Sequence, residues 1–208
     1  MKPAVPKVTV QRLPVYLRCL ESLPPGQSRV SSDELAALAG VTSAKVRKDL
    51  SYLGSYGVRG VGYEVEHLKF QIGLELGLER DWSVVIVGIG NLGSALASYA
   101  GFIERRFRIV GLFDRDPRKY GMQVGDLIVE PMERLRAVVV EREALIGMIT
   151  TPASAAQSVA QELADAGIRS ILNFAPGVIQ SPEGVDLRRV DLSTELQVLS
   201  FYLRRNGG

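Results

Sequence analysis

The chain has 208 residues, which is room for one large domain or two small ones, and its 46% hydrophobic and 23% charged residues are ordinary for a globular protein. It holds no apolar run that could span a bilayer and no signal-peptide core near its start, so we expect a cytoplasmic protein with no membrane partner. The net charge of +2 is uneven: residues 1–63 carry 9 basic and 4 acidic side chains and the rest carry 16 and 19, so we expect only the first part to bind a polyanion.

The single cysteine, Cys19, and the single histidine, His67, limit the chemistry further. One thiol cannot form an internal disulfide, and Cys19 stands among apolar residues, where it is expected to be a small buried side chain. The sequence has no cluster of Cys and His ligands, so we expect no metal site.

The first predicted helix runs from about Val10 to Leu23. Leu13, Tyr16 and Leu20 recur in it at helical spacing. Pro14 must lie in its first turn or kink it, because proline cannot donate the usual backbone hydrogen bond.

A helix-turn-helix pattern follows. Ser31 and Glu34 have the spacing of a capping box, and Gly40 ends the short helix that they begin. Thr42 or Ser43 then caps a second helix. Residues 54–65 alternate glycine with Val and Tyr, which predicts a short hairpin in the position of a wing.

The second helix of this pattern has a basic face. Val46 and Leu50 are four residues apart and face the core, which leaves Lys45 and Lys48 on another face. Such a face suits the DNA major groove, although a solvated charged surface is the alternative. The candidate DNA-binding residues are Ser31, Thr42, Ser43, Lys45, Arg47, Lys48, Ser51, Tyr52, Arg59 and Gly60.

After a connecting helix over about 66–80, strands and helices alternate. This pattern predicts a mostly parallel sheet. The expected strands are Ser83–Val87, Phe107–Phe113, Leu145–Ile149, Ile168–Asn173 and Arg188–Leu192, and the expected helices are Asn91–Ile103 and Ala153–Ala166. A last helix, Ser193–Arg205, has an apolar surface too wide for one flat contact, so we expect it to pack between two partners.

Residues 88–93 (GIGNLG) fit the G-x-G-x-x-G pattern of dinucleotide-binding proteins, between a predicted strand and a helix. Gly88 permits the tight turn, Gly90 lets the backbone approach a pyrophosphate, and Gly93 allows the helix to pack closely. The phosphates would meet the free N–H groups of the helix N-terminus. The alternative is a Rossmann-like sheet that binds no dinucleotide.

Asp114 stands 21 residues after Gly93, where an acid that binds the adenosine ribose is expected. Its carboxylate would repel a 2′-phosphate and favour NAD(H), an argument that Arg115 and Lys119 weaken. The candidate cofactor residues are Gly88, Ile89, Gly90, Asn91, Leu92, Gly93, Tyr99, Asp114, Arg115, Lys119, Thr150, Thr151, Pro152, Asn173, Phe174, Ala175 and Pro176.

Three of these residues, Phe174, Ala175 and Pro176, suggest an apolar seat for the nicotinamide ring. Such a seat would favour the neutral reduced ring over the cationic oxidised ring, because burying an unpaired charge is costly. The alternative is that Phe174 belongs to the core and Pro176 to a turn.

The sequence offers little for hydride-transfer catalysis, which normally needs a positioned His, Lys or Tyr. His67 precedes the nucleotide fold, Lys119 is the one lysine of the second half, and Tyr99 lacks a Tyr-x-x-x-Lys partner. We therefore expect no enzyme, with two alternatives left open: a small NAD-dependent enzyme, and a regulator that binds CoA or another nucleotide.

Together these motifs resemble the Rex family of redox-sensing transcriptional repressors. The resemblance covers nearly the whole chain, and its winged-helix run is specific. It is carried by Val46–Tyr52, Gly54–Gly57, Arg59–Tyr63, Val87–Leu96, Phe113–Asp114 and Ile171–Pro176.

The resemblance implies a homodimer that binds palindromic double-stranded operator DNA and represses genes of respiratory or fermentative metabolism. It implies that NADH is the effector that releases DNA, while NAD+ competes with it and permits DNA binding. It also implies a C-terminal helix swapped between subunits, and coupling between the sites through Arg18, Tyr99 and Asp191.

The expected fold is therefore α/β in three parts. Residues 1–80 form a winged-helix DNA-binding domain with its connecting helix, residues 81–192 a Rossmann NAD(H)-binding domain, and residues 193–208 a swapped helix.

Overall fold

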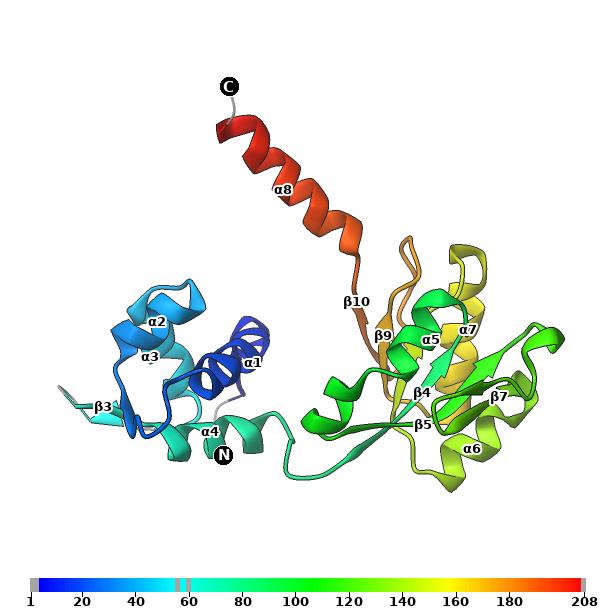
Figure 1. Ribbon diagram of the computed structural model, residues 1–208, viewed down its shortest axis with the longest axis horizontal. Coiled ribbons are helices and arrows are strands. Elements are labelled where there is room, and N and C mark those ends of the chain that lie inside the picture. Colours follow the sequence, from blue (N-terminus) through cyan, green and yellow to red (C-terminus); the bar gives the residue numbers. More distant parts are fainter. Residues whose placement is uncertain (1–3, 55–56, 59–60, 207–208) are drawn as a thin grey trace. The chain divides into compact units, whose positions relative to one another are not determined.

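The computed structural model describes residues 4–54, 57–58 and 61–206, and the chain forms two compact units, residues 1–80 and 81–208 (Figure 1). The expected α/β class is confirmed, with a mainly helical first unit and a largely parallel sheet in the second. Within the described part of the chain, no helix has both the length and the apolar character needed to cross a bilayer.

The first unit is a winged helix-turn-helix. Its elements are α1 (Lys7–Glu21), β1 (Arg29–Val30), α2 (Ser32–Ala39), α3 (Ser43–Ser51), β2 (Gly57–Val58), β3 (Gly62–Glu64) and α4 (Val65–Glu75). The strands form a small antiparallel sheet in the order β1-β3-β2. Both predicted caps are present, because Ser31 Oγ accepts a hydrogen bond from Glu34 N at 3.0 Å and Thr42 Oγ1 accepts one from Lys45 N at 3.4 Å.

The expected start of the first helix is wrong by three residues. The N–H groups of Thr9 and Val10 donate to the Pro6 carbonyl oxygen, so α1 already begins at Lys7. Pro14 consequently lies inside the helix rather than in its first turn. The connecting helix is shorter than expected, because α4 ends at Glu75.

The second unit is built on a seven-stranded sheet. Its elements are β4 (Trp82–Val87), α5 (Asn91–Ala97), the 3₁₀ turn Ala100–Arg105, β5 (Phe107–Asp114), the 3₁₀ turn Pro117–Lys119, β6 (Gln123–Val124), β7 (Leu127–Pro131), the 3₁₀ turn Met132–Arg134, α6 (Leu135–Glu141), β8 (Ile146–Ile149), α7 (Ala153–Ala166), β9 (Ser170–Asn173), β10 (Asp186–Arg189) and α8 (Leu192–Asn206). The strand order is β10-β9-β8-β4-β5-β7-β6, and the neighbours are parallel except for the pair β6 and β7.

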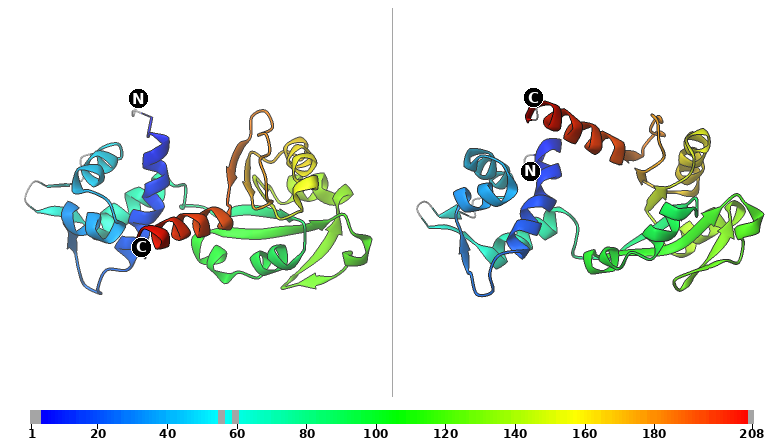
Figure 2. Two further views of the ribbon diagram at one scale, coloured as in Figure 1. Left: turned by 90° about the horizontal axis from the view of Figure 1, so that it is seen from above. Right: turned by 45° about the horizontal axis from the view of Figure 1, so that its top comes forward.

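Helices cover both faces of this sheet (Figure 2). Alternate residues of β4 point to opposite faces, as the pleat of a strand requires. Val85 and Val87 join the core under α6 and α7, and Val84 and Ile86 join a second core with residues of α5. A strand buried on both faces explains why residues 84–87 (VVIV) are all apolar.

Two expectations for this unit need correction, and one region had no prediction. The helix expected over Asn91–Ile103 is α5 followed by a separate 3₁₀ turn. The strand expected over Arg188–Leu192 ends at Arg189, because Asp191 instead accepts hydrogen bonds from the N–H and hydroxyl of Ser193 at the start of α8. The region between β5 and β8 had no prediction and contains β6, β7 and α6.

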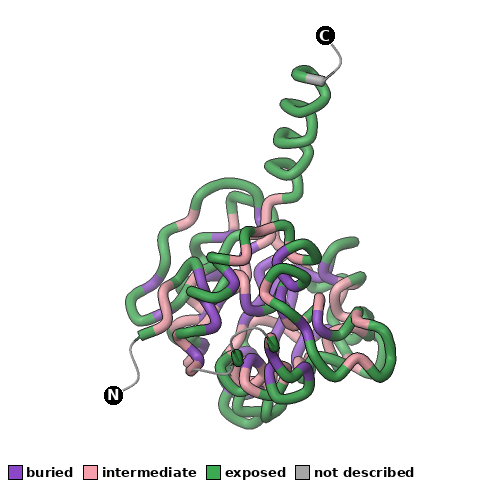
Figure 3. The backbone as a smooth tube through the Cα atoms, turned by 90° about the vertical axis from the view of Figure 1, so that its left-hand side faces the viewer, coloured by how far each residue is buried: buried purple, intermediate pink, exposed green. Residues whose placement is uncertain are grey.

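The last helix, α8, is solvent-exposed along its length in the single chain (Figure 3). Its exposed large apolar residues are Leu192, Leu196, Val198, Leu199, Phe201, Tyr202 and Leu203. An apolar surface of this extent on one helix is costly in water and is typical of an interaction site.

Candidate functional site

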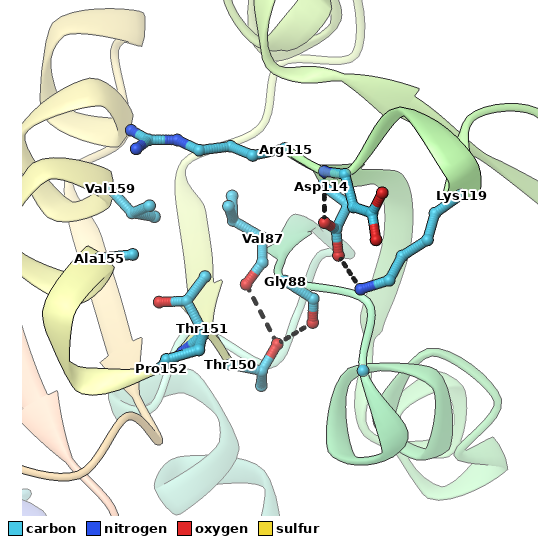
Figure 4. A pocket seen from close by; sticks show the side chains of 12 residues that line it. Val87, Gly88, Asp114, Arg115, Lys119, Thr150, Thr151, Pro152, Ala155 and Val159 are labelled. Carbon is cyan, nitrogen blue, oxygen red and sulfur yellow. Dashed lines mark hydrogen bonds and ion pairs between the residues drawn. The ribbon is translucent and has the colours of Figure 1, made fainter.

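A cavity of about 590 Å³ lies at the carboxyl ends of β4, β5 and β8 (Figure 4). In open parallel sheets this edge is where ligands bind. The lining residues are Val87, Gly88, Gly90, Asp114, Arg115, Asp116, Lys119, Thr150, Thr151, Pro152, Ala155 and Val159.

The glycine loop between β4 and α5 forms one wall of the cavity. Gly88 has φ +99°, and a Cβ there would lie 2.9 Å from the Thr150 and Thr151 backbone, so only glycine fits. A Cβ on Gly93 would collide with the Gly88 carbonyl oxygen. The hydroxyl of Thr150 donates to that same oxygen at 2.6 Å, which holds the loop in place.

Gly90 differs from these two positions, because a Cβ there would meet no atom within 4 Å. Among the described residues, nothing in the fold therefore requires glycine at position 90, which is the N-cap of α5 and lines the cavity. A close approach by a ligand to the helix N-terminus would require it.

Asp114 is buried at the end of β5, and its carboxylate is fully engaged. Oδ2 accepts hydrogen bonds from Ile89 N and from Lys119 Nζ, both at 2.7 Å, and Oδ1 accepts one from Asp116 N at 2.9 Å. Burial raises the pKa of Asp114, but the hydrogen bonds from Lys119 and from the two backbone N–H groups outweigh it, so the pKa lies below its ordinary value. The group is therefore an ionised acceptor at neutral pH.

Two further polar features mark the cavity. The guanidinium of Arg115 pairs with Glu162 and lies 3.3 Å from Ser158, so it reaches from the end of β5 toward α7 (Figure 4). Thr151 Oγ1 is buried and has no hydrogen-bond partner among the described residues. Buried polar atoms rarely stay unpaired, so this hydroxyl fits a bound polar group.

The structure brings eight of the predicted cofactor residues together in this lining. They are Gly88, Gly90, Asp114, Arg115, Lys119, Thr150, Thr151 and Pro152. Sequence reasoning missed Val87, Asp116, Ala155 and Val159, although the last two follow Pro152 at helical spacing and were open to the same argument.

The other predicted cofactor residues lie elsewhere. Ile89 and Gly93 are buried beneath the loop, and Asn91 and Leu92 are exposed on the first turn of α5. Tyr99 lines a separate cavity of about 580 Å³ and packs edge-on against Phe102, with ring centroids 5.0 Å apart.

The segment after β9 is mostly part of the core. Asn173 is buried and its Oδ1 accepts a hydrogen bond from Ala175 N at 3.0 Å. Phe174 packs against the core on the α5 side, Ala175 is buried on the other side, and Pro176 is exposed. Phe174 is half-buried, so it packs against the core and also keeps part of its surface exposed.

In the first unit, the basic face of α3 is exposed as predicted. Its exposed residues are Ala44, Lys45, Arg47, Lys48 and Ser51, next to exposed Thr42, whereas Ser43 and Tyr52 are half-buried. Arg47 donates to Ser32 Oγ at 2.9 Å, and both residues line a cavity of about 680 Å³ with Ser31 and the hairpin. Arg59 and Gly60 lie outside the described residues.

The inner face of α3 holds a carboxylate that sequence reasoning missed. Asp49 is 1% exposed and accepts hydrogen bonds from three residues of α1. The donors are Thr9 Oγ1 at 2.8 Å, Arg12 Nε and NH2 at 2.6 and 2.7 Å, and Tyr16 OH at 2.7 Å. Burial raises the pKa of Asp49, but the bonds from Arg12, Tyr16 and Thr9 outweigh it and lower the pKa.

A signal for this cluster was present in the sequence. Thr9, Arg12 and Tyr16 recur at spacings of three and four, so they share one face of α1 with Leu13 and Leu20. A cation on an inward helix face calls for a buried anion.

Comparisons with known proteins agree with this two-unit arrangement. One family model, a putative DNA-binding protein N-terminus, matches residues 4–51, and another, a CoA binding domain, matches residues 79–177. The chain is 56% identical over 205 residues to the redox-sensing transcriptional repressor Rex of Streptomyces coelicolor, across 98% of this chain and 80% of that protein. It is 49% identical to the Rex repressor of Carboxydothermus hydrogenoformans, across 97% and 98% of the two chains.

Three solved structures resemble the chain over almost its whole length. The crystal structure of RSP in complex with β-NAD+ and operator DNA has a TM-score of 0.90 and 36% identity, over 99% of this chain and 95% of that chain. The structure of RSP in complex with β-NADH has a TM-score of 0.88 and 35% identity, over 99% and 97%. A third RSP structure is described as that of a Rex-family repressor.

The two glycines Gly90 and Gly93 yield a paired prediction. Gly93→Ala forces a methyl group into the Gly88 carbonyl oxygen and should cost about 1–3 kcal/mol of folding free energy. Gly90→Ala has free space and should cost less than about 1 kcal/mol, but should weaken NADH binding about tenfold if the pyrophosphate approaches this backbone. Urea unfolding and NADH titration of both variants measure these effects, and wild-type NADH affinity in folded Gly90→Ala would contradict the assignment.

Proposed function

The chain belongs to the Rex family of redox-sensing transcriptional repressors, and on that premise we propose that its first unit binds operator DNA and that NADH bound in the second unit releases it. The strongest support for NADH binding is the cavity at Asp114. It contains the glycine loop and the Thr151 hydroxyl, which has no hydrogen-bond partner among the described residues. The protein is a regulator and not an enzyme, as its named relatives are repressors.

The proposed DNA interface consists of α3, the N-terminus of α2 and the hairpin. Lys45, Arg47 and Lys48 offer cations that contact phosphates or guanine edges in the major groove. Ser31, Thr42 and Ser51 supply hydroxyl groups that suit phosphate oxygens. The excess of basic residues in this unit supports its contact with a polyanion. A DNA-binding protein must be in the compartment that holds the DNA, so we propose that this protein is in the cytoplasm of a bacterium.

Three features of the cavity support NAD(H) as its ligand. Gly90 leaves room for the pyrophosphate at the N-terminus of α5, and Thr151 Oγ1, which has no hydrogen-bond partner among the described residues, can pair with a phosphate or ribose oxygen. Asp114 would accept the ribose hydroxyls in place of the bond from Lys119. The nicotinamide would lie toward the segment after β9, where the neutral reduced ring is easier to bury than the cationic ring.

We further propose a homodimer in which α8 packs against the partner subunit. All seven large apolar residues of α8 are exposed in the single chain, and a second copy can cover them. Dimerisation also suits a palindromic operator, because the two subunits can then place their α3 helices in two successive major grooves.

Light scattering tests this assembly. The wild-type chain should have about twice the monomer mass of 22.7 kDa. Leu199→Glu places a charge in the apolar surface and should shift the mass toward the monomer, whereas Gln197→Glu on the same helix is the matched control. A monomeric wild type, or an unaffected Leu199→Glu dimer, would rule out α8 as the dimer contact.

Coupling between the units is proposed to involve Arg18, Tyr99 and Asp191. Arg18 and Tyr99 are exposed in the single chain, and Asp191 caps α8 through Ser193. Exposure leaves Arg18 and Tyr99 accessible to new partners, whereas Asp191 would exchange its bonds with Ser193 for a new partner between a DNA-binding and an NADH-binding state. Only a difference in affinity between the two states can move the equilibrium.

Fluorescence anisotropy of a palindromic operator duplex at fixed salt tests the proposed function. NADH should release the duplex at far lower concentration than NAD+, and fixed salt is needed because phosphate contacts make the affinity salt-dependent. CoA is the third titrant, and release by CoA alone, or no DNA binding at all, would contradict the proposal.

The same titration with two variants separates the roles of Asp191. Asp191→Ala removes both the charge and the cap, whereas Asp191→Asn keeps a good helix cap and removes only the charge. If the charge couples the sites, both variants should bind DNA and NADH separately but lose release by NADH. Normal release in Asp191→Asn would exclude that role.

A further inference from the structure

The recognition helix α3 is attached to its unit by two kinds of contact. Val46 and Leu50 are buried in the core and make apolar contacts, which are strong but have no preferred direction. Between them on the same inner face lies Asp49, whose contacts are hydrogen bonds and therefore directional. The apolar pair alone would permit small rotations of the helix about its own axis.

The hydrogen bonds to Asp49 oppose such a rotation. Both carboxylate oxygens are engaged at 2.6–2.8 Å: Oδ1 accepts from Thr9 and Arg12, and Oδ2 accepts from Arg12 and Tyr16. Arg12 thus pairs with both oxygens, an arrangement that fixes the plane of the carboxylate as well as its position. Every one of these donors belongs to α1, so the hydrogen bonds fix the orientation of α3 relative to α1.

Charge is a second reason for this arrangement. A carboxylate on a helix with Lys45, Arg47 and Lys48 would repel DNA phosphates if it were exposed. Burial against Arg12 neutralises it, and Tyr16 and Thr9 satisfy its remaining lone pairs within the protein. A buried pair of this kind is weak evidence for stability, and its best-supported use is to select one arrangement of the elements that it joins.

We propose that Asp49 is a positioning residue for operator recognition: held by Arg12, Tyr16 and Thr9 of α1, it sets the rotation of α3 so that its basic face meets the base edges. This inference rests on the proposed DNA-binding function. It predicts a specific kind of defect, because base contacts require an accurate orientation whereas phosphate contacts tolerate variation. Loss of the hydrogen bonds between Asp49 and α1 should therefore reduce the affinity for operator DNA more than the affinity for unrelated duplexes.

The test compares the Kd for a palindromic operator with the Kd for a scrambled duplex, at fixed salt and well below the melting temperature of each variant. Tyr16→Phe removes one donor and keeps the ring in the core, and we expect its operator-to-scrambled preference to fall about threefold. Asp49→Asn should lower the preference about tenfold, because it removes the charge that Arg12 pairs with. NADH affinity should stay at the wild-type value in both variants.

Two controls separate positioning from other effects. Lys7→Met removes an exposed cation from α1. It should weaken binding to both duplexes equally and leave the operator preference unchanged. In the Asp49→Asn background, Tyr16→Phe should cause no further loss, since both changes break the same tie. A wild-type preference in folded Tyr16→Phe and Asp49→Asn would overturn the inference, whereas a wild-type chain without operator preference would instead contradict the proposed function.

Discussion

The close packing of α5 against the end of β4 is the constraint on which the second unit depends. Gly93 lies so close to the Gly88 carbonyl oxygen that no side chain fits, and the Thr150 hydroxyl donates to the same oxygen from the neighbouring strand end. This contact fixes the N-terminus of α5 at the carboxyl edge of the sheet. Gly90 at the start of that helix, Asp114 and Thr151 then line one cavity, at the edge of the sheet where ligands of such folds bind.

The first unit solves a different problem, since a recognition helix must be both basic and accurately oriented. Apolar burial of Val46 and Leu50 attaches α3, and the Asp49 cluster adds direction to that attachment. The key acidic side chains of the two units thus have different surroundings. Asp49 is enclosed and paired within the protein, whereas Asp114 is paired with Lys119 at the wall of a cavity.

Much of this organisation was predictable from the sequence, because local signals determine it. The caps Ser31 and Thr42 and the glycine loop at 88–93 act within a few residues, so their patterns are legible in one chain. The missed helix α6 has a different cause: its run Val138–Val140 is β-branched and favours a strand, and packing against α7 overrides that preference.

The contacts that sequence reasoning missed join residues far apart in the chain. Asp49 meets its partners from 33 to 40 positions away, and Arg115 reaches Glu162 across 47 positions. The spacing of Thr9, Arg12 and Tyr16 signals a buried anion, but which distant residue supplies that anion depends on the packing of whole elements.

If NADH and operator DNA prefer different states of one molecule, thermodynamic linkage makes the difference measurable. The Kd of NADH, followed by its fluorescence, is determined with and without saturating operator duplex at the same salt concentration. Operator should weaken NADH binding by the same factor by which NADH weakens operator binding. An NADH affinity that is indifferent to operator would contradict it, because no two-state coupling can act in one direction only.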